Sequence, residues 1–156
     1  MKSLIMKLIV FTLVFGIVAV AAAEPKIVGK TVEYTVQGMV MKGYLAYDEN
    51  IKGKHPGVLV VHEWWGLNDY IKQEAERYAN DFPEVNILAI DLYDGQLATN
   101  AEDAGKIMQS IQKERAEAII KGALNYVGPT AAIQTIGWCF GGGWSLQAAL
   151  ILGKLG

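Results

Sequence analysis

Hydrophobic and polar residues alternate along residues 30–47, with one interruption at Gly38. Alternation with a period of two is typical of a strand that has one buried and one solvated face. Two such stretches on either side of a glycine predict a β-hairpin. The apolar side chains expected on its buried face are those of Val32, Tyr34, Val36, Met39, Met41 and Leu45. The polar side chains expected on its solvated face are those of Thr31, Glu33, Thr35, Gln37 and Lys42.

Three later segments are mostly apolar and do not alternate: residues 57–61, residues 85–90 apart from Asn86, and residues 132–138 apart from Gln134 and Thr135. A strand that is covered on both faces produces such a run, and the strands of parallel sheets are usually covered in this way. A loop that contains polar residues or glycine follows each run. These segments therefore predict three strands of a parallel sheet.

Between these runs the apolar positions recur at helical spacing. A first helix is expected to begin at Asp69, whose side chain can cap it. Its buried positions would be Ile71, Ala75, Tyr78, Ala79 and Phe82. A second helical pattern covers residues 102–127, but its phase slips near Lys113, so one kinked helix and two shorter helices both fit it. The apolar run at residues 144–152 predicts a last helix.

Strands that alternate with helices predict an α/β fold in which a mostly parallel sheet is flanked by helices. Such sheets carry their reactive groups at the carboxyl ends of the strands. Three chemically active segments follow predicted strands: His62 with Glu63, then Asp91, then Cys139. The topology is expected to bring them to one rim. The sequence has no internal repeat and no low-complexity linker, which predicts a single domain.

The segment Gly137-Trp138-Cys139-Phe140-Gly141 carries the only cysteine of the chain, between a predicted strand and a predicted helix. A strand that reverses at once into a helix crowds its neighbours, which explains the small residues on both sides of the cysteine. The segment therefore predicts a nucleophile elbow, the G-x-S-x-G turn, with cysteine in place of serine. At a helix N-terminus, unpaired N–H groups and the helix dipole both favour the reactive thiolate. The N–H of Phe140 would supply half of an oxyanion hole.

Two other interpretations of this segment compete with the elbow. A lone cysteine among apolar residues is most often an inert small side chain. A phosphate-binding glycine turn is the other alternative, but the dinucleotide fingerprint would need a third glycine at the position of Leu146. The lysine that a P-loop carries before serine or threonine is also missing. The inert cysteine is therefore the main alternative to the elbow.

Residues 1–23 have the features of a secretory signal peptide. Lys2 and Lys7 precede an apolar run at residues 8–20, and three alanines follow it. The run is shorter than the roughly 20 residues of a membrane span, so an uncleaved anchor is the weaker alternative. We expect an exported protein, periplasmic or secreted, with its domain at residues 24–156. The net charge of −2 and the lack of a basic stripe argue against a nucleic-acid partner, and no metal or cofactor is expected.

Four segments of the chain together resemble the dienelactone hydrolase family of α/β-hydrolases. They are residues 55–61, residues 62–68, Asp91-Leu92-Tyr93 and residues 137–142. The resemblance implies a thiol hydrolase that cleaves a lactone or a related carboxylic ester, with Cys139 as its nucleophile. It also implies that Glu63 contacts the thiol and helps to set its ionisation. The N–H of Trp64 would then complete the oxyanion hole with that of Phe140.

The same residues also have structural interpretations. Glu63 could equally be a solvated loop acid or the partner of a lysine or arginine. For His62, hydrogen bonds that fix the loop are expected rather than a role as a base. Trp64 and Trp65 would wall the pocket or pack in the core. His62 and Tyr93 are further candidates for the pocket.

The chain departs from the family in two respects. Asp94-Gly95-Gln96 stands where family members carry an arginine that holds the substrate carboxylate, which argues against dienelactone itself as the substrate. An acid and a histidine should follow the nucleophile, whereas both histidines here precede Cys139. We therefore expect the N-terminal part of such an enzyme, truncated after the elbow helix, weakly active or inactive alone, with an uncovered edge on its last strand. The alternative is a non-catalytic exported binding or oligomerising module of the same fold.

Overall fold

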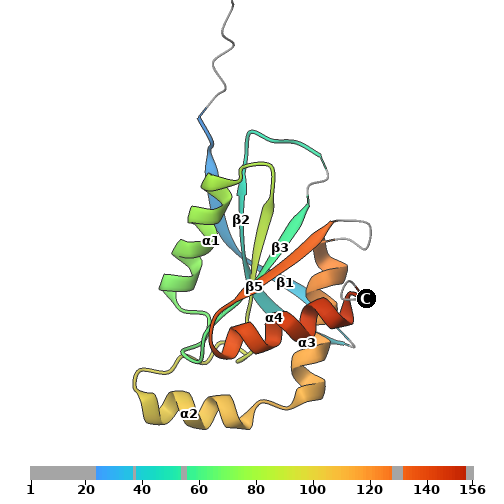
Figure 1. The fold of residues 1–156 in the computed structure, drawn as a ribbon. Coiled ribbons are helices and arrows are strands. Elements are labelled where there is room, and N and C mark those ends of the chain that lie inside the picture. The colour runs from blue at the N-terminus through green and yellow to red at the C-terminus, as the bar shows by residue number, and fades with distance from the viewer. Residues whose placement is uncertain (1–23, 37, 54–55, 128–131, 154–156) are drawn as a thin grey trace, which may run out of the picture.

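The computed structural model describes residues 24–153 except positions 37, 54–55 and 128–131. Within these residues the chain forms a five-stranded sheet and four helices (Figure 1). The strands are β1 (Ile27–Val36), β2 (Met39–Asp48), β3 (Gly57–Val61), β4 (Asn86–Ile90) and β5 (Ile133–Gly137). The helices are α1 (Asp69–Asp81), α2 (Ala101–Ser110), α3 (Lys113–Val127) and α4 (Phe140–Ile151). The predicted α/β class is confirmed.

The strands lie in the order β1-β2-β4-β3-β5. β1 and β2 form the predicted hairpin, in which Val36 lies opposite Met39. β3 pairs in parallel with both β4 and β5, and β2 pairs antiparallel with β4. β2 therefore runs against the other strands, and the sheet is mixed but mostly parallel. Because β3 and its neighbours are parallel, the loops after β3, β4 and β5 leave the sheet at the same rim.

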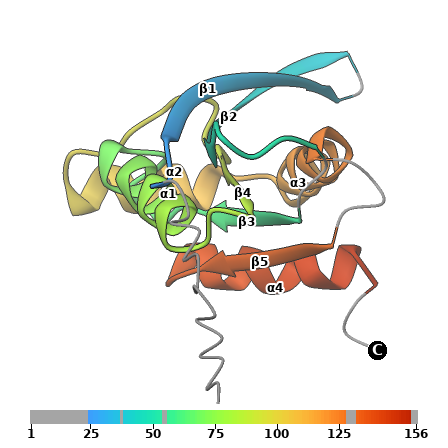
Figure 2. The same ribbon diagram turned by 90° about the horizontal axis from the view of Figure 1, so that it is seen from above.

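Helices cover both faces of the sheet (Figure 2). α1 packs on one face, against β1, β2 and β4, and α3 and α4 pack on the other. Each face has its own apolar core, with Ala75 and Ala79 of α1 in one and Ile119 and Ile120 of α3 in the other. None of the helices described is long and apolar enough to cross a membrane.

The first predicted helix is confirmed, with two corrections at its ends. Its N-cap is Asn68 and not Asp69: the Asn68 side chain accepts a hydrogen bond of 3.1 Å from the N–H of Ile71. Asp69 is instead the first helical residue, where its charge suits the positive end of the helix dipole. Phe82, which we placed on the buried face, is 54% exposed because the helix has ended before it.

The second helical pattern is two helices, α2 and α3, and not one kinked helix. Ile111 lies between them with extended backbone angles, φ −66° and ψ 120°. The slip in the apolar phase near Lys113 thus marked a true break in the chain. Because of this break, the apolar side of α3, from Ala116 to Ala123, packs against the sheet.

β5 lies at the end of the sheet that the structure describes, and β3 is its one strand partner there. Its exposure along the strand is uneven, since Ile133 is buried whereas Gln134 is exposed. The expected open edge is therefore present within the described residues. The predicted signal peptide at residues 1–23, Gln37 and His55 lie outside those residues.

Candidate active site

The turn between β5 and α4 carries Cys139 in a strained backbone conformation. Its φ of 53° and ψ of −122° lie in a region that residues with a β carbon rarely occupy. Such a conformation costs about 1–3 kcal/mol, which the surrounding structure must offset. β5 ends at Gly137 and α4 begins at Phe140, so two residues make the whole reversal. This is the geometry predicted for a nucleophile elbow, and it leaves the Cys139 side chain exposed.

The glycines on either side of the cysteine are required by close backbone approach. A β carbon on Gly137 would overlap the carbonyl group of Gly141. A β carbon on Gly141 would overlap the carbonyl oxygen of Val61 and lie 2.5 Å from that of His62. The first turn of α4 therefore packs directly on the end of β3. The crowding inferred from the sequence is confirmed at both positions.

Backbone N–H groups at the elbow are available to a bound anion. The N–H groups of Gly142 and Gly143 turn back to the carbonyl oxygen of Cys139, at 3.0 and 3.4 Å. The N–H groups of Phe140 and Trp64 have no hydrogen-bond partner within the part of the chain that the structure describes. Phe140 is the first residue of α4, where the helix dipole is positive. Both proposed oxyanion donors are therefore free to bind a negatively charged oxygen.

The loop after β3 lies beside the elbow because of the sheet register. Val61, the last residue of β3, is the partner of Gly137, the last residue of β5. Glu63 and Cys139 each lie two residues beyond this pair, on adjacent loops. The Glu63 carboxylate is half-buried and has no ion-pair or hydrogen-bond partner among the described residues. A lysine or arginine partner, one of the two structural interpretations of Glu63, is thus not found there.

His62 is fully buried and uses both ring nitrogens. Its Nε2 accepts a hydrogen bond of 3.1 Å from the N–H of Leu92, and its Nδ1 donates to the carbonyl oxygen of Glu63 at 2.6 Å. Burial lowers the pKa of His62, although the Glu63 carbonyl and the charge of Asp91 oppose this. The ring is therefore neutral and joins the ends of β3 and β4. The loop-fixing hydrogen bonds expected of His62 are present, and neither nitrogen is free to act as a base.

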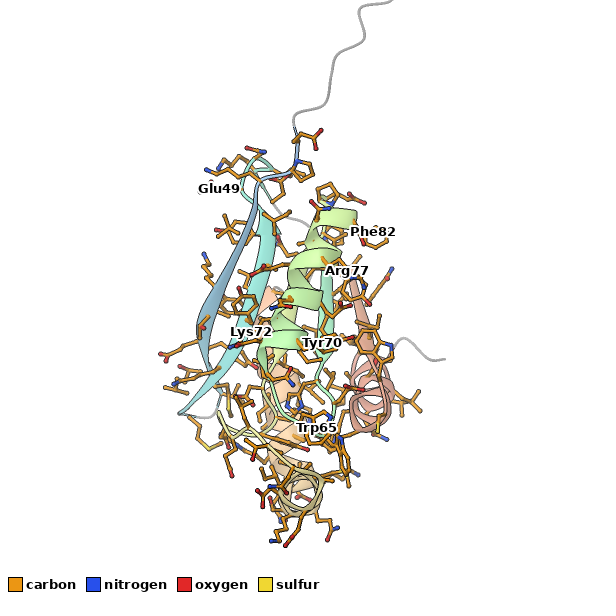
Figure 3. All side chains as sticks on the ribbon, turned by 90° about the vertical axis from the view of Figure 1, so that its left-hand side faces the viewer. Glu49, Trp65, Tyr70, Lys72, Arg77 and Phe82 are labelled. Carbon is orange, nitrogen blue, oxygen red and sulfur yellow. The ribbon has the colours of Figure 1, made fainter. Side chains whose placement is uncertain are left out.

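Aromatic rings pack beneath the elbow and around the loop after β3. The ring of Tyr93 lies edge-on to His62, with centroids 4.6 Å apart, and 5.5 Å from the ring of Phe140. Trp64 and Trp65 contact each other edge to face, with centroids 5.1 Å apart. Both tryptophans remain partly exposed, and Figure 3 shows Trp65 at the end of α1 that faces this rim. The two tryptophans therefore lie partly exposed on the loop after β3.

The loop after β4 is held by Asp91, a role that the sequence did not reveal. Its carboxylate accepts hydrogen bonds from the N–H groups of Tyr93 and Gly95, at 2.9 and 2.6 Å. Asp94 adopts a left-handed conformation with φ 53° and pairs with Arg115 of α3 at 2.6 Å. Nothing in the sequence links these two residues, which lie 21 positions apart. Within the described ranges, no three His, Cys, Asp or Glu side chains gather as a metal site would require.

Thr135 and Ser145 tie the elbow strand to the elbow helix. The Thr135 hydroxyl donates to the carbonyl oxygen of Ser145, and the Ser145 hydroxyl donates to the Thr135 hydroxyl, both at 3.0 Å. On the other face of β5, the ring of Trp138 stacks on Tyr78 of α1, with centroids 6.3 Å apart. These contacts hold β5 and α4 in place on either side of Cys139.

The strand order, the helices on both faces and the strained turn between β5 and α4 define an α/β-hydrolase. Comparison with known proteins makes the assignment specific. The chain belongs to the dienelactone hydrolase family, whose family model matches residues 41–155.

Individual proteins and solved structures are also similar to this chain. Protein usf of Aquifex pyrophilus is 33% identical over 133 residues, which cover 78% of this chain and 55% of that protein. The solved structure of m3DLH is 31% identical and superposes with a TM-score of 0.65, covering 79% of this chain and 54% of that one. A dienelactone hydrolase-like promiscuous phosphotriesterase from metagenomic libraries is 26% identical, with the same TM-score and coverage. The chain thus spans about half the length of these relatives.

Proposed function

We propose that this protein is a hydrolase of lactones or related carboxylic esters in which the Cys139 thiolate is the nucleophile. The observation that carries the proposal is the strained conformation of Cys139 at a turn where the N–H of the next residue, Phe140, has no partner among the described residues. Strain of this kind persists mainly where function requires it. An inert cysteine would have no reason to occupy such a turn.

The reaction begins with attack of the Cys139 sulfur on the carbonyl carbon of the ester. The carbonyl oxygen becomes an oxyanion, which the N–H groups of Phe140 and Trp64 stabilise. The C–O bond then breaks, the alkoxide leaves and takes a proton from water, and the acyl group remains on sulfur as a thioester. Water hydrolyses the thioester, which releases the acid and restores the thiol.

Acylation and deacylation make different demands on proton transfer. The thiolate already lacks its proton, so acylation by an ester with a good leaving group needs no base. Deacylation needs a base to activate water, and His62 cannot serve because both its nitrogens are engaged. We therefore propose that this chain acylates and then releases the acid slowly. Full turnover would be an activity of the longer architecture that its relatives share.

p-Nitrophenyl acetate tests this function through the amplitude of product release. The parent chain, with Cys139 intact, should release about one equivalent of p-nitrophenol in a fast phase, followed by a much slower phase. Cys139→Ser should show no fast phase, because a serine hydroxyl without a base is far less ionised than a thiol. Equal release by the parent chain and Cys139→Ser would refute the proposal.

The substrate class is proposed from the family and from the loop after β4. The family acts on lactones, but the position after Asp91-Leu92-Tyr93 carries no arginine, and Arg115 is already paired with Asp94. A neutral lactone or ester therefore fits this site better than dienelactone, which carries a carboxylate. Acylation by a neutral butenolide and by its carboxymethyl analogue should favour the neutral compound.

We also propose that the protein is exported. The sequence of residues 1–23 supports this, and the described domain begins at Glu24, whose carbonyl oxygen accepts a hydrogen bond from Asn50 at 3.1 Å. Cleavage after Ala23 would therefore leave the described fold intact. Expression of the full sequence in a bacterial host should yield a periplasmic form whose mass corresponds to a start at Glu24. Retention of the full mass in the membrane fraction would favour an anchor instead.

A groove beside β5 favours a second candidate function, that of an oligomerising module. The groove has a volume of about 440 Å³ and lies between the C-terminal end of α1 and β5. Its lining residues include Val58, Tyr78, Phe82, Val85 and Ile136. Figure 3 shows Phe82 at the end of α1 opposite to Trp65, so the groove and the elbow are separate. An apolar groove beside an open strand edge is a surface on which another chain could pair.

Sedimentation of the chain at increasing concentration separates the two candidate functions. An oligomerising module should form a defined dimer, and Gln134→Lys should weaken the dimer because a charged side chain on an edge strand opposes pairing. Gln134 is exposed and lines the groove, so the substitution should leave the fold stable. A monomer with an intact acylation burst would leave the hydrolase as the supported function.

A further inference from the structure

Tyr93 carries a buried hydroxyl group for which the described part of the chain offers no hydrogen-bond partner. The residue is 1% exposed. A buried hydroxyl without a partner loses its hydrogen bonds to water and gains none in return, so such groups are rare and call for an explanation. The family motif Asp91-Leu92-Tyr93 accounts for the fold of the loop but not for this phenol.

The Tyr93 side chain is held firmly in its place. Its N–H is fixed by the Asp91 carboxylate at 2.9 Å, and its ring packs against the rings of His62 and Phe140. Phe140 directly follows Cys139, and His62 directly precedes Glu63. The unpartnered hydroxyl is therefore anchored in the layer of rings beneath the elbow. A small movement of Tyr93 away from this site would break contacts with two other loops.

The phenol is a hydrogen-bond donor at every pH at which the enzyme would work. Burial, and to a smaller extent the charge of Cys139, raises the pKa of Tyr93 to about 12. The hydroxyl therefore keeps its proton and can donate a hydrogen bond to a negatively charged acceptor. Cys139 directly precedes Phe140, whose ring packs against that of Tyr93 with centroids 5.5 Å apart.

We propose that Tyr93 is a positioning residue for the nucleophile: its hydroxyl donates a hydrogen bond to the Cys139 thiolate when the Cys139 side chain turns inward from solvent. The proposal rests on the proposed function of Cys139 and deepens it. In the structure described here the thiol is exposed and the hydroxyl unpartnered, so each lacks what the other would supply. The bond would favour the thiolate and aim the sulfur at a bound ester.

Other ionisable groups lie on the loops beside the elbow, so the test has to isolate the hydroxyl. The ionisable groups on the loops packed against the elbow are His62, Glu63, Asp91, Tyr93 and Asp94, and Arg115 of α3 pairs with Asp94. Tyr93→Phe removes one oxygen atom and changes none of these charges. Tyr34→Phe is a matched control, because the Tyr34 hydroxyl is also buried without a partner in the described residues. The ring of Tyr34 packs on Tyr126 of α3 and not on the elbow.

The experiment measures the rate of Cys139 alkylation by iodoacetamide between pH 5 and pH 10 in the parent chain and both variants. Tyr93→Phe should move the midpoint of the pH profile upward by about one pH unit, the size expected for a hydrogen bond to a charged group. Tyr34→Phe should leave the midpoint unchanged. Both variants should keep the thermal stability of the parent, since neither loses a hydrogen bond of the resting structure.

Two results would contradict this inference in different ways. Normal alkylation with the same midpoint in all three chains, or an equal shift in both variants, would overturn the role of Tyr93 and leave Cys139 as nucleophile. Failure of iodoacetamide to modify Cys139 in any chain would overturn the proposed function and this inference together.

Discussion

The backbone of Gly141 lies against the carbonyl oxygen of His62: a β carbon on Gly141 would be 2.5 Å from that oxygen. His62 follows β3, and Gly141 is the second residue of α4. This contact therefore sets the distance between the loop that carries Glu63 and the turn that carries Cys139. The contact exists only because residue 141 has no side chain. The site is therefore assembled by backbone packing, with glycine as its requirement.

Gly141→Ala should push the first turn of α4 away from β3. The added carbon overlaps two backbone carbonyl groups that cannot move independently, so the free energy of unfolding should fall by about 1–3 kcal/mol or more. The acylation burst should fall with it, because the oxyanion N–H groups would separate. Urea unfolding and p-nitrophenol release measure the two effects.

Gly143→Ala is the matched control for that variant. Gly143 is also in α4, but a β carbon there would meet no atom within 4 Å. Alanine is a better helix former than glycine by about 1 kcal/mol, so this variant should be as stable as the parent or slightly more stable. Equal losses of stability in both variants would show that Gly141 is not a special packing position.

Thr135→Val should loosen the link between β5 and α4. The substitution removes the hydroxyl that donates to the Ser145 carbonyl and accepts from the Ser145 hydroxyl. The free energy of unfolding should fall by about 1–2 kcal/mol in thermal or urea unfolding. Thr135→Ser keeps the hydroxyl and should retain most of that stability; if it falls as far as Thr135→Val, packing of the methyl group and not hydrogen bonding is responsible.

Glu63→Gln should move the pH profile of Cys139 alkylation downward, opposite to the shift expected of Tyr93→Phe. A carboxylate near the thiol disfavours a second negative charge, and the amide removes that effect while keeping the shape. Glu49→Gln is the control. Glu49 follows β2, at the end of the sheet opposite to this rim, and its carboxylate pairs with Lys26. An unchanged profile in Glu63→Gln would show that its carboxylate does not act on the thiol.

The stability of the domain should depend on pH through His62. Its pKa is lowered in the folded chain from the ordinary 6.5, because burial opposes its charge. As the pH falls below 6.5, the unfolded chain binds a proton that the folded chain does not. Stability is therefore present above that pH and is lost as the pH falls toward the lowered value, by about 1.4 kcal/mol per pH unit at most.

His62→Gln isolates this contribution from that of the carboxylates. The difference in unfolding free energy between the parent and the variant should shrink between pH 7.5 and pH 5.5, measured by urea unfolding. A constant difference over this range would mean that His62 binds its proton equally well in the folded and unfolded chains. A difference that grows as the pH falls would mean that the folded chain holds the proton more tightly, contrary to the acceptor role of His62 toward the N–H of Leu92.

Local patterns predicted most of the fold because each element has a clear period. The alternation in the hairpin, the unbroken apolar run of β3 and the phase slip at Lys113 each correspond to an observed element or break. The errors lie at the ends of elements. At Asn68 and Phe82 one residue decides between cap and helix, and Met39, expected on the buried face of the hairpin, is 41% exposed at the start of β2. Two neighbouring residues that can both cap a helix are not distinguished by sequence alone.

The site was predictable only where its residues lie within one motif. The elbow was predictable, since its glycines and cysteine lie within five consecutive residues and the crowding is local. The pairing of Asp94 with Arg115 and that of Thr135 with Ser145 arise from tertiary packing across 21 and 10 positions, and no short pattern announces them. The unpartnered hydroxyl of Tyr93 is likewise a property of the packed interior.

The most direct test of the account locates the acyl group after a short reaction with p-nitrophenyl acetate. We predict one acetyl group per folded chain, on the peptide that contains Cys139, and none in Cys139→Ser or Cys139→Ala. The thioester should persist for many minutes and disappear on addition of hydroxylamine. Acetyl groups found only on lysines, or sustained multiple turnover by this chain alone, would contradict the roles assigned here to Cys139 and His62.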